Sequence, residues 1–247
     1  MRLQAWDKLP PSMQREEIRP YYESLRKKRV GLFFKRVFDV VASFLMLTVL
    51  LPFFLILAIA IKIDSPGPVF YRQVRVTQYG KQFRTFKFRS MVQHADKGSK
   101  VTVEGDSRVT RVGRVIRKCR LDELCQLIDV LRGTMTFVGT RPEVPKFAEC
   151  YTPEMMATLL LPAGVTNLTS IYYKDEERLL ANAEDPEQIY VREILPQKMY
   201  YNLKGLKQFS LLGDFKLMFM TVFAMLGKEY TDEHQTQQSN EPTESNL

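Results

Sequence analysis

The sequence is poor in the residues that build metal centres and disulfide frameworks. It has two histidines, His94 and His234, and three cysteines, Cys119, Cys125 and Cys150, with no C-x-x-C pair among them. An odd number of cysteines cannot all pair with one another, and this spacing does not suit a zinc site. The composition therefore argues against a zinc-centred or disulfide-stabilised fold, and we expect reduced thiols in a cytosolic compartment.

Charge is missing from one long stretch of the chain. No Asp, Glu, Lys or Arg occurs from Val40 to Ile61. At about 1.5 Å per residue, a helix over this run is long enough to cross a bilayer. A core helix of a soluble protein shows a polar stripe, which is lacking here. The run also starts too far into the chain, and without a small-residue cleavage site, for a signal peptide. We therefore predict a membrane-inserted helix.

Two features bear on how this helix lies in the membrane. Pro52 falls inside the run, where a proline removes a backbone donor and kinks or breaks a helix. Basic residues flank both ends: Lys35 and Arg36 precede the run, and Lys62, Arg72, Arg75, Lys81 and Arg84 follow it. Because positive flanks favour the cytoplasmic side, a helix–break–helix hairpin that enters and leaves by that side accounts for both clusters. A proline-kinked spanning helix is the alternative.

The chain as a whole is basic, with 36 Lys and Arg against 28 Asp and Glu and a net charge of +8. Such an excess suits a nucleic acid, an anionic membrane surface or phosphorylated substrates. Residues 69–75 and 82–89 predict a β-hairpin, and its basic residues alternate with aromatic ones. This alternation fits nucleic-acid binding or a strand with a buried aromatic face and a basic face toward lipid phosphates. Beside an inserted helix we favour the second interpretation.

Further elements follow from residue spacing. Arginines at every third position from Arg108 to Arg120 predict a basic amphipathic helix suited to anionic headgroups. Leucines at helical spacing predict a helix over 122–132 that Gly133 ends. Residues 135–138 predict a short apolar strand, and the apolar run 215–226 predicts an interfacial helix.

These patterns predict an α+β fold, mainly helical. Its parts are an N-terminal basic segment (1–34), a re-entrant membrane helix (35–63), a small cytoplasmic catalytic domain with interfacial amphipathic helices (64–227) and a disordered polar tail (228–247).

The adjacent acids Asp122 and Glu123 open the predicted helix 122–132. Taken alone, they suit a helix N-cap and a first-turn carboxylate. Their neighbours favour chemistry, because Arg117 lies upstream and Arg141 lies downstream in a Gly-x-Arg-Pro loop. Phosphoryl transfer needs cationic clamps, together with a nucleophilic carboxylate or an activated acceptor. A divalent ion would offset the repulsion between a carboxylate and a diphosphate.

Several linked motifs in the stretch 35–145 resemble those of the bacterial sugar transferases, the monotopic polyprenyl-phosphate phosphoglycosyl transferases. The motifs are "KRVFDVVAS", "LPFFLILAIAIKIDSPGPVFYRQ", "KFRSM" and "DSRVTRVGRVIRKCRLDELCQLIDVLRGTMTFVGTRPEVP". The resemblance implies a re-entrant hairpin broken at a proline, which matches Pro52, on the cytoplasmic face of the bacterial inner membrane. It also implies transfer of a sugar-1-phosphate from a UDP-sugar to polyprenyl phosphate, with release of UMP and a requirement for Mg²⁺.

The resemblance assigns roles by position. Asp122 would attack the sugar-bearing phosphate and contact the metal, and Glu123 would assist as a base or by placing the metal. Arg117 and Arg141 match phosphate-binding arginines, and Asp106, Arg108 and Arg89 match supporting positions. Cys125 and Thr140 stand where the family usually has proline. The distal stretch "PAGVTNLTSIYYKD" departs from the family's "PGITGWAQVNGR", and Lys174 falls near the place of its arginine.

Two other functions fit parts of the sequence. A non-catalytic membrane adaptor of polysaccharide assembly would keep the fold, but it would not need Asp122, Glu123, Arg117 and Arg141 together. A membrane-tethered nucleic-acid binder would use the basic hairpin, but the chain has no recognised reading motif, so we expect no nucleic-acid partner. The sequence leaves open the sugar, the glycan pathway and whether two chains pair as a homodimer.

Overall fold

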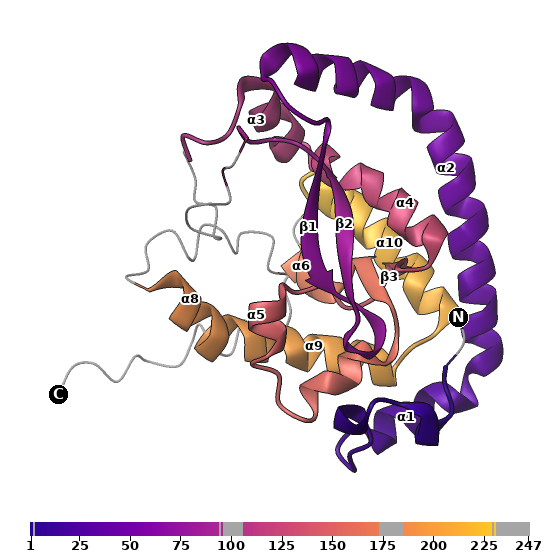
Figure 1. Ribbon diagram of the computed structural model, residues 1–247. Helices are drawn as coiled ribbons and strands as arrows, with labels where there is room; N and C mark the ends of the chain where they lie inside the picture. The colour runs from indigo at the N-terminus through magenta and orange to yellow at the C-terminus, as the bar shows by residue number, and fades with distance from the viewer. Residues whose placement is uncertain (2, 94, 96–105, 173–184, 229, 231–247) are drawn as a thin grey trace.

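The computed structural model describes residues 1, 3–93, 95, 106–172, 185–228 and 230. Within these residues the protein is mainly helical, with two small two-stranded sheets, which confirms the α+β prediction in outline. The long helix α2 (Arg29–Asp64) arcs along one side and over the top of the other elements (Figure 1). Lys174 and nearly all of the predicted tail 228–247 lie outside the described residues.

Helix α2 continues through Pro52 as one bent helix and does not break there into the two helices that the sequence predicted. Pro52 has no amide hydrogen to donate to the carbonyl of Thr48, one turn earlier. The Thr48 hydroxyl also donates to the Phe44 carbonyl oxygen at 2.9 Å, a contact that bends helices. The helix therefore bends near its middle but remains a single helix from Arg29 to Asp64.

Both arms of α2 pack on the same body of the protein. Buried residues recur at helical spacing near each end of the helix: Leu32, Lys35, Asp39 and Ser43 in the first arm, and Phe54, Leu57 and Ile61 in the second. No residue between Ser43 and Phe54 is buried. The arms of the arc thus bury side chains in the protein, whereas Leu47, Leu50 and Phe53 in the bend are only partly buried against it.

Polar contacts attach the first arm. Lys35 Nζ donates to Asp214 Oδ2 of α10 (Leu211–Met225) at 2.5 Å. Asp39 accepts hydrogen bonds from the Thr136 hydroxyl at 2.8 Å and from the Phe137 amide at 3.3 Å. Lys35 and Asp214 thus form a salt bridge, and Asp39 is hydrogen-bonded. Such contacts offset the cost of burying charged groups.

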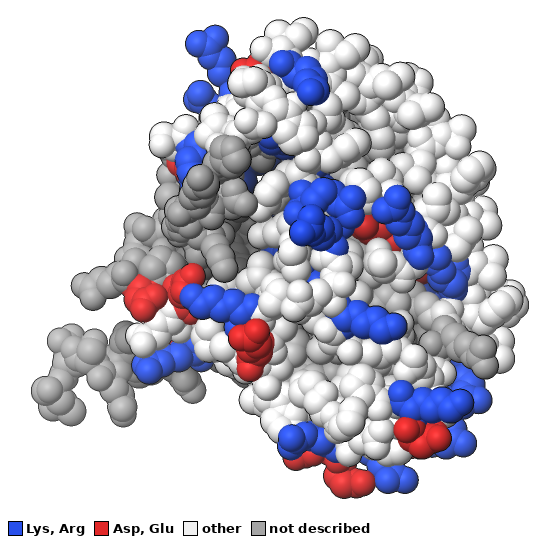
Figure 2. All heavy atoms as spheres, viewed as in Figure 1, with Lys and Arg blue, Asp and Glu red and all other residues white. Residues whose placement is uncertain are grey.

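The outer face of α2 is apolar and exposed. Val49 is 77% exposed and Ile63 is 82% exposed. Only 6% of the most apolar 18-residue stretch is buried, whereas the core helix of a soluble protein is mostly buried. Within the described part of the chain, α2 is the one helix long and apolar enough to cross a membrane. Figure 2 shows the upper right edge of the molecule, along the middle of α2, without charged side chains.

The predicted hairpin is confirmed. Strands β1 (Phe70–Val76) and β2 (Gln82–Phe88) pair antiparallel, with Gln73 opposite Thr85. Gly80 in the turn has a positive φ of 74°. This conformation favours glycine, because a side chain there would be strained. Lys and Arg side chains gather over this hairpin in Figure 2.

The arginine-rich helix is shorter than its repeat. Helix α3 (Arg111–Lys118) begins after Thr110, whose hydroxyl accepts a hydrogen bond from the Gly113 amide at 3.0 Å, as expected of an N-cap threonine. A side chain at Gly113 would collide with the Ser90 carbonyl. A 3₁₀-helix, η5 (Leu121–Gln126), follows.

The rest of the fold matches the predicted order. Helix α4 (Leu127–Arg132) ends at Gly133 with φ 86°, and β3 (Met135–Val138) is the predicted strand. A glycine in this left-handed conformation is a common helix end. Strand β3 pairs in parallel with β4 (Ala163–Thr166). The remaining helical elements are η1 (Trp6–Lys8), η2 (Pro11–Met13), α1 (Arg19–Lys27), η3 (Gln78–Gly80), α5 (Pro145–Ala148), η6 (Met155–Leu160), α6 (Leu168–Tyr172), α8 (Pro186–Ile189), η7 (Tyr190–Ile194) and α9 (Leu195–Lys207).

The N-terminal segment belongs to the packed core. Ile18, Tyr22 and Leu25 are buried in and beside α1 and join a cluster with Leu160 of η6 and Leu206 of α9. No element was predicted here from the sequence, because many charged residues lie between these apolar positions and their helical spacing is not evident.

Candidate active site

The acids Asp122 and Glu123 lie in the first turn of η5. The sequence had suggested that one of them caps an α-helix, but neither does. The residue in the cap position before η5 is Arg120, which has φ 52° and makes no side-chain cap hydrogen bond. A left-handed conformation costs a residue other than glycine about 1–2 kcal/mol. Such strained residues persist where their surroundings hold them, often at active sites. The turn at Arg120 brings the two acids beside strand β2.

Two cations clamp the carboxylate of Glu123. Arg141 donates from Nη2 to Oε1 at 2.5 Å and from Nη1 to Oε2 at 3.1 Å, a two-point contact of the kind that guanidinium groups make with carboxylates. Lys87 Nζ of β2 donates to Oε1 at 2.9 Å. The structure thus brings Arg141 to the acid pair, although 18 residues separate it from Glu123 in the chain.

Lys87 was not among the residues singled out from the sequence. It is the first residue of the "KFRSM" motif, two positions before Arg89, which was chosen instead. The signal was the alternation of basic and aromatic residues over 82–89, which predicts a strand with one basic face. In the structure β2 ends at Phe88, so it includes Lys87 but not Arg89. What the pattern lacked was the place of η5 against β2.

The two acids differ in their electrostatics. Burial raises the pKa of Asp122 above its ordinary value and nearby Glu123 adds to the shift, although Lys87 and Arg117 oppose it. Burial also acts to raise the pKa of Glu123, but Arg141 and Lys87 outweigh it, so this pKa lies well below its ordinary value. Glu123 is therefore held as a carboxylate by its salt bridges. No side chain in the described parts of the chain donates to the carboxylate of Asp122.

Hydrogen bonds to the main chain on both sides of Arg141, three from backbone amides and one from a side chain, hold the Gly139–Glu143 loop in place. They are Gly139 N to Thr166 O at 3.0 Å, Gly164 N to Thr140 O at 2.8 Å, Arg75 Nη1 to Pro142 O at 2.9 Å and Val76 N to Glu143 O at 2.9 Å. β1 and β4 thus fix the backbone from which the Arg141 side chain reaches Glu123.

The predicted phosphate-binding arginines divide into groups. Arg117 of α3 lies close enough to lower the pKa of both Asp122 and Asp106. Arg108 is paired with Asp106, donating from Nη2 at 2.5 Å, and this pairing lowers the pKa of Asp106 to about 2. Arg117 is therefore an electrostatic neighbour of both Asp122 and Asp106.

Arg89 has different contacts. It is buried, and its guanidinium donates to the carbonyl oxygens of Ser65 at 2.6 Å, Pro66 at 2.5 Å and Ile61 at 3.3 Å. These groups lie at the end of α2, where helix carbonyls lack partners within the helix. Arg89 caps α2 in this structure, and the hydrogen bonds of its side chain do not lead to the acid pair.

Asp122 could bind a magnesium ion only together with waters and substrate phosphates. The described residues contain no cluster of three His, Cys, Asp or Glu side chains that could hold a metal by themselves. Mg²⁺, however, commonly uses one or two carboxylates, several waters and substrate phosphates. Glu123 forms salt bridges with Arg141 and Lys87, so Asp122 is the carboxylate of the pair that is left to bind Mg²⁺ in this way.

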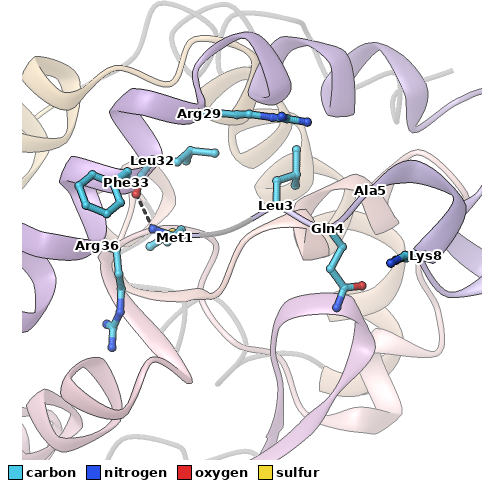
Figure 3. Close-up of a pocket in the computed structure, with 9 residues that line it drawn as sticks. All are labelled: Met1, Leu3, Gln4, Ala5, Lys8, Arg29, Leu32, Phe33 and Arg36. Carbon is cyan, nitrogen blue, oxygen red and sulfur yellow. Dashed lines mark hydrogen bonds between the residues drawn. The ribbon is translucent and has the colours of Figure 1, made fainter.

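A separate hollow of about 990 Å³ lies beside the first turn of α2 (Figure 3). Met1, Leu3, Gln4, Ala5, Lys8, Arg29, Leu32, Phe33 and Arg36 line it. None of the predicted site residues does, so this hollow is distinct from the acid pair.

Comparison with known proteins identifies the family of the chain. Residues 30–228 match the family model described as "Bacterial sugar transferase". The chain is 35% identical over 207 residues to a "UDP-N-acetylgalactosamine-undecaprenyl-phosphate N-acetylgalactosaminephosphotransferase" of Aeromonas hydrophila, covering 82% of this chain and 46% of the relative.

Two further relatives are similar. A "UDP-glucose:undecaprenyl-phosphate glucose-1-phosphate transferase" of Caulobacter vibrioides is 35% identical over 196 residues, 78% of this chain and 69% of the relative. An "Exopolysaccharide production protein PSS" of Rhizobium leguminosarum bv. phaseoli is 34% identical over 205 residues, which cover 80% of this chain and 97% of the relative. The chain thus spans less than half of the Aeromonas relative and nearly all of the Rhizobium one. With the family model matched over most of its length, the chain belongs to the bacterial sugar transferase family.

Proposed function

We propose that this protein transfers a sugar-1-phosphate from a UDP-sugar to polyprenyl phosphate, of which undecaprenyl phosphate is the form named in its relatives. The observation that carries the proposal is the division of roles between two adjacent acids. Glu123 is held ionised by Arg141 and Lys87, whereas the Asp122 carboxylate has a raised pKa and no side-chain donor in the described structure. Asp122 is therefore the acid placed to react.

The reaction proceeds in two displacements at one phosphorus atom. A carboxylate oxygen of Asp122 attacks the sugar-bearing phosphorus of the UDP-sugar, the bond to the bridging oxygen breaks, and UMP leaves. A phosphate oxygen of polyprenyl phosphate then attacks the same phosphorus, and the Asp122 carboxylate leaves. The product is a polyprenyl-diphosphate sugar, and the carboxylate is restored.

Cations around the pair bind the charged substrate. Arg141 and Lys87 face Glu123, and Arg117 lies near Asp122, so a diphosphate meets positive charge from three elements. Glu123 orients Arg141 and Lys87 and would assist the incoming lipid phosphate. Mg²⁺, held by Asp122 and the diphosphate, would supply charge neutralisation on the phosphate oxygens.

We further propose that α2 enters and leaves the membrane by the cytoplasmic face of the bacterial inner membrane. Its two arms pack on one body, and a helix that crossed the bilayer would carry its ends to opposite sides. The exposed apolar face of α2 supports insertion of its bend. Helix α10 also exposes large apolar side chains, among them Leu212 and Phe219, and such a helix is suited to lie at the interface.

Release of UMP before any lipid is added tests the covalent route. Purified protein with Mg²⁺ and a panel of UDP-sugars, including UDP-glucose and UDP-N-acetylgalactosamine, should release at most one equivalent of UMP per active site. Its mass should rise by that of a sugar phosphate, and polyprenyl phosphate should remove the adduct. Asp122→Asn should abolish burst and adduct, while Asp7→Asn, an exposed acid in η1, should change neither.

Turnover with lipid but without burst or adduct would contradict the nucleophile role and leave Asp122 as a metal ligand for direct transfer. No turnover with any UDP-sugar, in protein that binds vesicles, would favour a membrane adaptor.

Labelling of introduced cysteines tests the membrane arrangement. In intact cells, cysteines introduced near Arg29, at the start of α2, and near Thr77, beyond its end, should both be protected from an impermeant reagent and react after lysis. Reaction of either one from outside would show that α2 spans the membrane.

A further inference from the structure

A buried polar cluster lies behind the Arg141 loop, away from the acid pair. Glu143, two residues after Arg141, is 6% exposed, and Lys198 of α9 is 4% exposed. The Tyr190 hydroxyl donates to Glu143 Oε1 at 2.6 Å. Lys198 Nζ donates to the Tyr190 oxygen at 2.9 Å and lies 3.4 Å from Glu143 Oε1. The three side chains form a closed triangle of polar contacts.

This triangle depends on a π-helical turn. Residues 186–207 are helical throughout, but η7 (Tyr190–Ile194) is wound as a π-helix, with the Leu195 amide bonded to the Tyr190 carbonyl. In a regular α-helix, residues eight apart lie about 80° away from each other around the axis. One residue taken up by a π-turn reduces this offset to about 20°. The π-turn therefore brings Tyr190 and Lys198 onto one face of the helix.

Pro196 gives a local reason for the π-turn. It stands in the first turn of α9. It has no amide hydrogen for the Arg192 carbonyl four residues earlier, and its ring would press on that carbonyl in a regular α-helix. Widening the preceding turn relieves this contact. Turns of this kind occur often at functional sites.

Contacts of Glu143 lead from the cluster to the acid pair. Its carbonyl accepts from the Val76 amide at 2.9 Å, and the preceding Pro142 carbonyl accepts from Arg75 Nη1 at 2.9 Å. Arg75 is also an electrostatic neighbour of both Glu143 and Glu123. Arg141 is thus followed by Pro142, whose carbonyl is held, and by Glu143, whose main chain and side chain are both held.

Stability alone does not explain this arrangement. A buried ion pair contributes little net stability, because the cost of removing its charges from water offsets their attraction. Apolar residues of similar volume would fill the space at least as well. Directional polar contacts, in contrast, set the position of the Glu143 backbone, and with it the start of the Arg141 side chain.

We propose that Tyr190 and Lys198 are positioning residues that clamp Glu143 from the π-turn and thereby hold Arg141 at the acid pair. The proposal rests on the function proposed above for Arg141. It makes the helical segment 186–207 part of the active-site support, although none of its residues contacts Asp122 or Glu123 in the described structure.

Hydrogen exchange gives a test that does not depend on activity. Tyr190→Phe removes the hydroxyl and keeps the ring, which packs against Phe147 with centroids 4.5 Å apart. The amide of Val76 should then exchange about tenfold faster, since its acceptor is the Glu143 carbonyl. The matched control is Tyr21→Phe. Tyr21 belongs to the same apolar cluster as Val76, but its hydroxyl donates to the carboxylate of Glu154, at 2.5 Å, and not to that of Glu143. This control should leave exchange at Val76 unchanged.

A double-mutant cycle tests whether the effect passes through Arg141. Tyr190→Phe should lower kcat/KM for UMP release about tenfold in the wild-type background. In an Arg141→Lys background the same change should cost about twofold or less, because the group it positions is already altered. Lys198→Met is the second variant and should behave in the same way.

The outcomes separate the two proposals. Equal losses from Tyr190→Phe in both backgrounds, or unchanged exchange at Val76, would overturn the positioning role. A wild-type protein that releases no UMP from any UDP-sugar would overturn the proposed function. The hydrogen-exchange measurement at Val76 would still show whether Tyr190 and Lys198 hold Glu143 in place.

Discussion

Replacing Arg141 by lysine separates the geometry of its contact from its charge. In the structure the guanidinium reaches both oxygens of Glu123, at 2.5 and 3.1 Å. A lysine in its place keeps the positive charge but presents a single ammonium group, which does not reproduce the planar two-point contact. The same planar group is the one we propose to bind a substrate phosphate. Arg141→Lys should therefore lower turnover while the protein stays folded.

The expected size of the loss follows from the contacts. At least one charge-assisted hydrogen bond disappears, and such a bond contributes about 1.5–3 kcal/mol. If that bond is made fully in the transition state, kcat/KM falls about 10- to 150-fold. The Arg141 side chain is 32% exposed. Solvent screening therefore places the result toward the lower end of this range.

UMP release with polyprenyl phosphate present measures the effect, and a thermal melt confirms folding. Arg111→Lys is the matched control, since Arg111 is an exposed arginine at the start of α3. Its turnover should change by about twofold or less, as for surface substitutions away from a site. Equal losses at both positions would refute the reasoning and mean that the arginines act through bulk positive charge.

Two further predictions concern the support of the site. Gly164→Ala should destabilise the protein by about 1–3 kcal/mol in chemical denaturation, because the new Cβ would collide with the backbone of Gly139. The control is Gly205→Ala, which has open space around the new Cβ and should be neutral or stabilising. Equal effects of the two substitutions on the unfolding free energy would contradict the argument. Glu143→Gln should change the pH dependence of stability: burial raises the pKa of Glu143, but Lys198 and its other partners outweigh this and lower it below the ordinary 4.5. The stabilisation is therefore complete above pH 4.5 and is lost as pH falls through the lower folded-state pKa. The gap in unfolding free energy between wild type and variant should narrow on acidification, and a constant gap would contradict this assignment.

Local patterns in the sequence determined most of the secondary structure near the site. The β1–β2 hairpin, strand β3 and the end of α4 at Gly133 lie where alternation and turn residues predicted them. The uncharged run predicted the long apolar helix, because membrane-length helices depend on composition alone. Linked motifs identified the family and the pair Asp122 and Glu123.

The course of α2 through Pro52 could not be predicted in the same way. A proline weakens a helix locally, but whether the helix breaks or bends depends on what its two arms pack against. Here both arms are attached, by Lys35 and Asp39 at one end and by Phe54 and Ile61 at the other, so the helix bends.

Only the tertiary structure decided which cations meet which acids. Spacing along the chain put Lys87 and Arg89 in one predicted strand, yet Arg89 caps the end of α2 and Lys87 binds Glu123. The link from Glu143 to Tyr190, 47 residues later, has no local signal at all. The physical reason is range: helix and strand periodicity act over a few residues, whereas a charged side chain finds its partner through the packing of elements that are distant in the sequence.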